Sequence, residues 1–327
     1  RMMHDEALLQ PINIFTQMPS CAPSAPGLET TGYAITEKDV AEAMAWPGII
    51  GLGEMMNFPG VVAGDQQKLA EIAATQAAGK TVGGHYASPD LGPAAACHSG
   101  TRGIDGHMDR GARHAIACGC DPLVALQTAS LNTATHFGLE RELGSITPGR
   151  RADVIITSDL ATLPIAEVIA HGQTVARGGT LEVACPHYPW PDAVRQTVRM
   201  GAPKTAADFE IQAPVGANRV RARVIGVVEN QAPTKALSQD LPVIEGLVEG
   251  EGDVCQIALV ERHQATGGVT NAFVSGFGYK GPMAMASTVA HDSHHMIVVG
   301  TARENMALAA NRLAQVGGGM TVWKDGE

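Results

Sequence analysis

The strongest constraint on the fold is a strand–helix–strand pattern near the N-terminus. Residues 46–53, WPGIIGLG, form an apolar run that ends in glycine, as a buried strand would. Residues 65–79, DQQKLAEIAATQAAG, follow with Ala and Leu at helical spacing and a glycine stop, and residues 80–84 form a second short strand. Strand, helix and strand joined by short connections are typical of a parallel sheet. We therefore predict an α/β fold.

Three parts can be distinguished along the chain. Strand and helix patterns alternate up to about residue 150. The next part has β-branched strand patterns and a hairpin with a His-Gly turn, before a loop rich in proline. The last part alternates strands with glycine-rich loops and ends in a helix that Gly317–Gly319 stops. We predict one domain at 1–150, a second at 151–185 and a third at 200–327.

Composition excludes several classes of protein. The 327 residues carry a formal net charge of −10, whereas a general nucleic-acid binder has a basic surface. No apolar run reaches the ~20 residues that a membrane helix needs, and the first 20 residues are too polar for a signal peptide. Six cysteines without regular spacing do not make a disulfide framework. We expect a reduced, soluble, cytoplasmic protein that binds neither nucleic acid nor membranes.

Three side chains that could bind a metal follow short apolar or small-residue runs. Glu54 comes directly after GIIGLG, His85 follows KTVGG, and His98 lies in AACHSG. A lone glutamate there is more often a solvated turn residue, and a lone histidine is more often structural. Three such groups at comparable strand ends favour a shared metal site, because the carboxyl ends of parallel strands meet at one edge.

Two further groups are candidates for substrate contacts. Asp90, five residues past His85, could bind a substrate or cap a turn. His291, Asp292 and His294 stand in VAHDSHHMIVVG, beside an apolar strand. This second cluster is compatible with a surface metal site, a structural network, contacts to a neighbouring active site, or simply solvated histidines.

Several longer segments of the chain carry a resemblance to a known family, among them GLGEMMNFPGV, GGHYASPDLG, GSITPGRRADVII and VAHDSHHMIVVGT. They resemble the microbial adenine deaminases of the amidohydrolase superfamily. The third is shared among amidohydrolases, whereas GEMMNFPGV and VAHDSHH are specific to the deaminases. The resemblance implies a (β/α)8 TIM barrel that holds a metal pair, a small β-sandwich beside it and a C-terminal α/β domain.

The resemblance also implies roles for individual residues. The Glu of GEMM, which maps onto Glu54, bridges the two metals and makes this residue catalytic. His85 maps onto a metal ligand, and His98 maps onto another, although Ser99 replaces the acidic residue expected after it. The implied metals are Mn²⁺ or Fe²⁺, with Zn²⁺ also compatible. Activated water would convert adenine to hypoxanthine and ammonia in purine salvage, and a homo-oligomer is expected.

Two departures from this family affect the interpretation. The first-strand HxH pair, which would precede the segment matching Met3–Pro19, is absent, and only six residues separate His98 from Asp105. That is too few for further barrel strands and helices. We therefore interpret the barrel as incomplete, with segments missing before residue 1 and around 94–105. The alternatives are another amidohydrolase that acts on a cyclic amide, or a relative that has lost catalysis and serves as a binding or scaffold protein.

Overall fold

The chain divides into two compact units in the computed structural model, which describes residues 1–23, 27, 29–84, 108–229, 233–290 and 293–324. The first unit contains Arg1–Cys21 and Ile35–Pro189, and the second contains Ala22–Ala34 and Trp190–Glu327. The second unit is therefore discontinuous in sequence, since a short segment leaves the first unit after Cys21 and returns at Ile35. The domain boundaries expected from sequence stay predictions.

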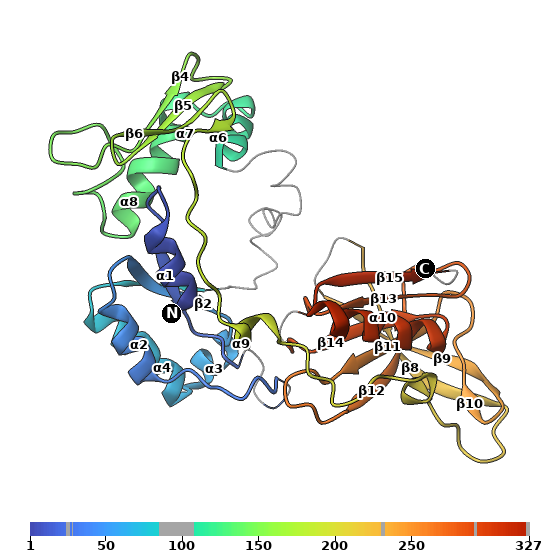
Figure 1. The fold of residues 1–327 in the computed structure, drawn as a ribbon. Coiled ribbons are helices and arrows are strands. Elements are labelled where there is room, and N and C mark those ends of the chain that lie inside the picture. The colour runs from blue at the N-terminus through green and yellow to red at the C-terminus, as the bar shows by residue number, and fades with distance from the viewer. Residues whose placement is uncertain (24–26, 28, 85–107, 230–232, 291–292, 325–327) are drawn as a thin grey trace. The chain divides into compact units, whose positions relative to one another are not determined.

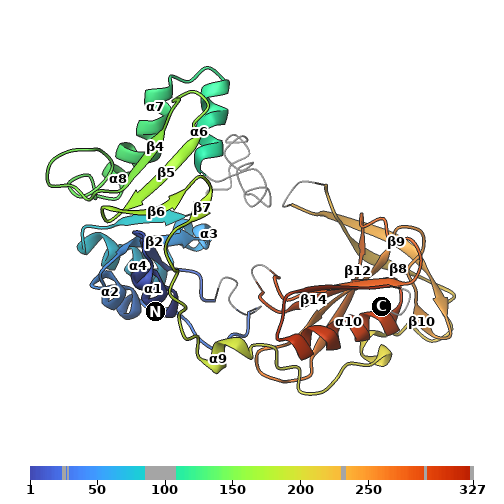
Figure 2. The same ribbon diagram turned by 45° about the horizontal axis from the view of Figure 1, so that its top comes forward.

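The first unit contains a parallel sheet with the order β1-β2-β3. Helices α2 and α4 pack against each other and against this sheet (Figures 1 and 2). The strand–helix–strand prediction is confirmed, because β2, α4 and β3 match its three segments. The elements are α1 (Met2–Leu9), β1 (Thr16–Pro19), α2 (Glu37–Met44), β2 (Ile49–Met55), α3 (Phe58–Ala63), α4 (Gln66–Ala77) and β3 (Thr81–Gly84).

Side-chain caps explain where the covering helices begin. Asp65 accepts hydrogen bonds from the backbone amides of Gln67 and Lys68 at the start of α4. Thr36 and Asp39 form a reciprocal capping box at the start of α2. Each cap satisfies amides that the first helical turn leaves without a partner, which contributes about 1 kcal/mol.

An antiparallel sheet with the order β4-β5-β6-β7 follows in the same unit. The turn between β5 and β6 is His171-Gly172, and both residues have positive φ, as a tight hairpin requires. This confirms the predicted hairpin. The strands of 151–185 form one four-stranded sheet, and its place in a β-sandwich stays a prediction. The elements are α6 (Met108–Ala117), α7 (Pro122–Gln127), the π-helix η3 (Thr128–Asn132), α8 (Thr133–His136), β4 (Val154–Thr157), β5 (Ile165–Ala170), β6 (Gln173–Arg177) and β7 (Thr180–Leu181).

The second unit is an eight-stranded sheet with helix α10 across one face (Figures 1 and 2). The order is β10-β9-β8-β12-β11-β14-β13-β15, and the pairing is antiparallel except between β8 and β12. The second unit does combine helix and sheet, but its mainly antiparallel pairing gives an α+β arrangement, and the C-terminal domain expected from sequence stays a prediction. Its elements are α9 (Asp192–Arg195), the 3₁₀ helix η4 (Ala206–Phe209), β8 (Arg219–Gly226), β9 (Lys235–Ile244), β10 (Leu247–Val248), β11 (Cys255–Val260), β12 (Val269–Ser275), β13 (Met283–Ser287), β14 (Met296–Gly300), α10 (Arg303–Val316) and β15 (Met320–Lys324).

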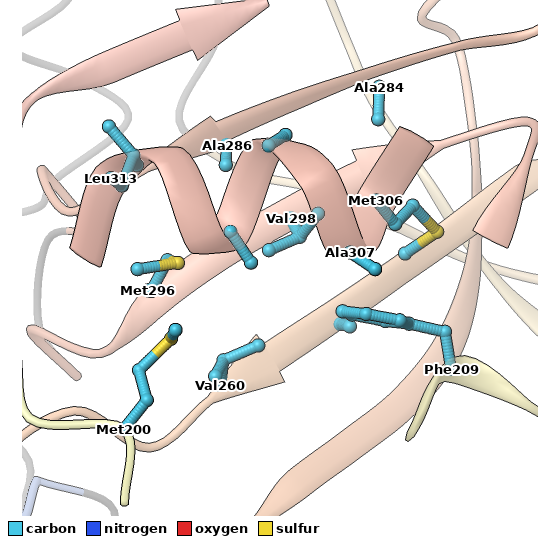
Figure 3. Packing of buried hydrophobic residues seen from close by; sticks show 13 residues of the cluster. Met200, Phe209, Val260, Ala284, Ala286, Met296, Val298, Met306, Ala307 and Leu313 are labelled. Carbon is cyan, nitrogen blue, oxygen red and sulfur yellow. The ribbon is translucent and has the colours of Figure 1, made fainter. Parts of the chain in front are cut away.

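The main core of the second unit lies between α10 and the sheet (Figure 3). Phe209, from η4, packs there with Met306 and Leu313 of α10, and all three side chains are almost completely buried. Small residues on β13, Ala284 and Ala286, let the helix approach the strands closely. No helix in the described part of the chain is long and apolar enough to cross a membrane.

Candidate metal centre

Glu54 lies near the carboxyl end of β2, at an irregularity in the sheet. Leu52 pairs with Val82 and Met55 pairs with Gly84, so two residues of β2 stand opposite one residue of β3. Glu54 itself has a φ of 57°, in the left-handed region that side-chain-bearing residues seldom adopt. Such an extra residue re-aims a side chain at a strand end and is common beside active sites. The glutamate that the sequence singled out is therefore held in a special backbone conformation.

Glycines allow the strands to meet closely around this irregularity. A Cβ added to Gly84 would lie 2.9 Å from the Cβ of Met55, and one added to Gly53 would lie 3.0 Å from the Cβ of Gln17. Close approach of neighbouring strands thus favours glycine at positions 53 and 84. Their absence of side chains also leaves space beside Glu54.

That space is a cavity of about 400 Å³ at the carboxyl end of the parallel sheet. Its wall includes the exposed Glu54 and the amide side chain of Gln17. Much of the rest of the cavity wall is glycine backbone. The lining residues are Gln17, Pro19, Gly53, Glu54, Gly83 and Gly84. In sheets of parallel strands this end is where binding and catalytic groups gather.

Two residues that follow β1 contact Glu54. The Ser20 hydroxyl donates to the Glu54 carbonyl oxygen at 2.9 Å, and Ser20 is 2% exposed. The Sγ of Cys21 lies 4.0 Å from Oε2 of the Glu54 carboxylate. The backbone of Glu54 is therefore fixed by a buried hydroxyl, while its carboxylate stays at the cavity wall.

The other metal ligands expected from sequence cannot be placed with Glu54. His85 follows Gly84 of the cavity wall in the chain, but His85, His98 and Asp90 lie outside the described residues. Within the described ranges, no three His, Cys, Asp or Glu side chains form a metal-binding group. The shared site of Glu54, His85 and His98 stays a prediction. The described cavity fits one carboxylate ligand, a donor type that suits Mn²⁺ and other hard divalent ions.

His294, from the second candidate cluster, is described in the second unit. Its Nδ1 lies 3.1 Å from Oε1 of Glu29, whose side chain is 3% exposed. The neighbouring His295 is buried, and its ring lies 5.2 Å from that of His263. Burial, followed by nearby Arg262 and His295, lowers the pKa of His263. His291 and Asp292 lie outside the described residues, so their predicted role in substrate binding stays a prediction, as does that of His294.

A carboxylate organises the loop between β11 and β12. Glu261 accepts hydrogen bonds from the amides of His263, Gln264 and Thr266 and from the Thr266 hydroxyl. Burial raises the pKa of Glu261, but these hydrogen bonds outweigh burial and lower it to about 2. The Thr30 hydroxyl also donates to Glu261, and the side chain of Gln264 donates to the Thr30 carbonyl. Glu261 thus links this loop to the short segment 22–34.

Acid is expected to weaken the second unit through Glu261. Because folding lowers its pKa from 4.5 to about 2, its stabilisation is complete above pH 4.5 and is lost as the pH falls toward 2. Urea unfolding of Glu261→Gln should show a lower free energy than wild type at pH 6 and a smaller difference at pH 3. Glu210→Gln, an exposed carboxylate in the same unit, is the control. A constant difference across this pH range would contradict the assignment.

A second cavity of about 700 Å³ is larger but mostly apolar. It is lined by Phe15, by Ile50 near the start of β2, and by side chains of α6, α8 and β4. It therefore includes the amino-terminal part of β2 rather than the carboxyl end that holds Glu54. Its chemistry offers little for hydrolysis, so we assign the candidate centre to the smaller cavity.

Comparison with known proteins identifies the chain's relatives. A family model for the amidohydrolase family matches residues 95–178, and one for the adenine deaminase C-terminal domain matches residues 231–327. An amidohydrolase domain implies a TIM barrel. Two separate parts of the chain thus match one general model and one model specific to deaminases.

Curated relatives match the whole chain. An adenine deaminase of Ruegeria pomeroyi is 65% identical over 393 aligned positions, one of Roseobacter denitrificans is 63% identical over 389, and one of Moorella thermoacetica is 39% identical over 392. These alignments cover 100% of this chain and 65–66% of each relative, so the chain spans about two thirds of their length. The chain is thus similar along its whole length to curated adenine deaminases, and part of it matches the amidohydrolase family.

Proposed function

We propose that the protein catalyses the hydrolytic deamination of adenine to hypoxanthine and ammonia. The observation that carries the proposal is 65% identity to an adenine deaminase over the whole of this chain. The match of residues 231–327 to a domain named for adenine deaminases supports the same activity. It also disfavours the alternative of an amidohydrolase that acts on a cyclic amide. Purine salvage, a cytoplasmic location and homo-oligomers fit this activity as further proposals.

We propose further that Glu54, together with His85 and His98, would hold a divalent metal pair, most simply Mn²⁺ or Fe²⁺. Support comes from the exposed Glu54 carboxylate in the cavity at the carboxyl end of β2. When bound, such metals lower the pKa of water from ~15.7 to ~7 and so provide hydroxide at neutral pH. The residues of this chain would hold the metal ions, orient the adenine substrate and shape the cavity. Asp90, His291, Asp292 and His294 remain proposed substrate contacts.

The wall of the cavity suits a planar base. Gly53, Gly83 and Gly84 present backbone, which leaves room for a flat aromatic ring. Gln17 offers one acceptor and one donor on its carboxamide, and this pair complements the amino group and ring nitrogen along one edge of adenine. Both features favour an adenine ring as the substrate.

We propose that the three parallel strands are part of a (β/α)8 barrel, some of whose other segments are missing around 94–105. The alignment with the Ruegeria pomeroyi relative has 393 positions, 66 more than the 327 residues of this chain. The relative therefore carries residues for which this chain has no counterpart. A gap between His98 and Asp105 would account for the short spacing noted from the sequence.

Ammonia release from adenine tests the proposed function. The purified protein should release ammonia with Mn²⁺ present, lose this activity after chelation and regain it when Mn²⁺ is returned. Adenosine should be a poor substrate, because the relatives that the chain resembles are named as deaminases of the free base adenine. Absence of ammonia release from adenine with Mn²⁺, or equal turnover of adenosine, would contradict the proposal and favour a binding protein or another hydrolase.

A further inference from the structure

A buried chain of contacts runs from helix α4 to the backbone of Glu54. Oε1 of Glu71 lies 2.8 Å from Nζ of Lys68, one turn earlier on the helix. The same Nζ donates to the carbonyl oxygen of Ser20 at 3.0 Å, and the Ser20 hydroxyl donates to the carbonyl of Glu54 at 2.9 Å. Two side chains of α4 are thus connected to the candidate metal ligand through the residue that follows β1.

The ion pair between Lys68 and Glu71 is buried, and burial of two charges costs free energy of folding. Lys68 is 6% exposed and Glu71 is 0% exposed, so both charges leave water when the chain folds. A buried pair of this kind is often no more stabilising than apolar residues of similar volume. What the pair provides is a fixed ammonium group aimed at one carbonyl, and hydrogen bonds from a charged donor are stronger than those from a neutral one.

The conformation of Glu54 explains why a fixed neighbour matters. A residue with a side chain at a φ of 57° is strained, and such strain persists only where the surrounding structure holds it. Ser20 makes two contacts with this part of β2, because its amide also donates to the Gly53 carbonyl at 3.3 Å. A shift of Ser20 would therefore release the irregular segment that aims Glu54 into the cavity.

We propose that Lys68, held by Glu71, is a positioning residue that acts through Ser20 to orient Glu54 for metal binding. The proposal rests on the proposed function for its metal, but its geometry concerns residues of this chain alone. Neither residue belongs to the motifs that identified the family, since both lie on the helix between the two strands. Removal of Lys68 should change metal affinity rather than stability alone.

The experiment compares two lysines of the first unit whose ammonium groups donate to backbone carbonyls, Lys68 to Ser20 after β1 and Lys80 near the start of β2. In the complete protein, Lys68→Met should weaken Mn²⁺ binding by about 10- to 100-fold, the range typical of residues that orient a metal ligand. Lys80→Met is the matched control, because Nζ of Lys80 donates to the carbonyls of Met44 and Ile49 near the start of the strand. It should lower the melting temperature but leave the Kd for Mn²⁺ within about twofold of wild type, since no contact with Glu54 is lost.

A double variant separates positioning from stability. Lys68→Met combined with Glu71→Leu removes both buried charges, so it should regain stability relative to Lys68→Met. Its Kd for Mn²⁺ should nevertheless stay as weak as that of the single variant, because Ser20 still lacks its charged donor. Recovery of Mn²⁺ affinity together with stability would overturn the proposal, and so would a Kd for Lys68→Met within twofold of wild type.

Hydrogen exchange of the metal-free protein provides a readout that needs no metal. Amides of residues 53–57 should exchange faster in Lys68→Met than in wild type, whereas Lys80→Met should leave them unchanged. If wild type binds no Mn²⁺, the proposed function fails, and exchange alone then decides the positioning role. Equal exchange of these amides in Lys68→Met and wild type would overturn it.

Discussion

Replacing Glu54 by glutamine is expected to reduce adenine deamination by more than about 100-fold, because loss of a residue that merely orients a metal ligand already costs 10- to 100-fold. Glutamine keeps the shape of glutamate and removes its charge. The Ser20 hydroxyl contacts the backbone carbonyl of residue 54, which the substitution leaves in place. The fold should therefore survive, and initial rates of ammonia release with saturating Mn²⁺ would measure the loss.

The matched control for this variant is Glu245→Gln. Glu245 is also an exposed glutamate with a left-handed backbone, at a φ of 51°, but it lies in the turn between β9 and β10 of the second unit. Activity of Glu245→Gln should equal that of wild type. Full activity and full Mn²⁺ binding in Glu54→Gln would contradict the proposal that Glu54 is a catalytic metal ligand.

Replacing Phe209 by alanine is expected to lower the free energy of unfolding of the second unit by about 3–5 kcal/mol. Phe209 is 0% exposed and lies under α10 in the same core as Met306 and Ala307 (Figure 3). Its ring fills the end of the main core, so truncation removes apolar burial and leaves a cavity. Its carbonyl also accepts a hydrogen bond from the buried Gln256, and this contact makes the surrounding backbone resist collapse into the space.

Urea unfolding followed by a probe of the second unit would measure this effect. Trp323 packs against the same core and provides an intrinsic fluorescence signal. Val215→Ala, at a fully exposed position of this unit, should change the free energy by no more than about 0.5 kcal/mol. A loss below about 1 kcal/mol for Phe209→Ala would show that this core is not packed as described.

The parts of the fold that sequence predicts well are those encoded by short-range patterns. The run WPGIIGLG, the cap at Asp65 and the glycine after α4 specify β2, α4 and β3, because each signal acts over a few residues. The hairpin at His171-Gly172 is another such case, since its turn needs two residues at positive φ. The place of Glu54 at a strand end follows from the same patterns.

The supports of Glu54 could not be predicted because they arise from contacts between distant residues. Lys68 meets the Ser20 carbonyl across 48 positions of sequence, and no periodicity marks that contact. The spacing of Lys68 and Glu71 predicts only a helical ion pair, of the kind usually found on exposed faces. The extra residue in β2 depends on the register with β3, which single-strand patterns do not encode. The cavity could therefore not be predicted, because the sequence pattern of one strand does not show how that strand pairs with its neighbours.

The backbone of Glu54 also bears on any effort to make the protein more heat-resistant. Glycine adopts the left-handed region without the cost of about 1–2 kcal/mol that a Cβ imposes, so a glycine at position 54 would relieve the chain. A screen that ranks variants by heat resistance alone would therefore enrich proteins without a carboxylate in the cavity. Directed evolution of this protein should therefore measure catalytic turnover as well as thermal stability for each variant.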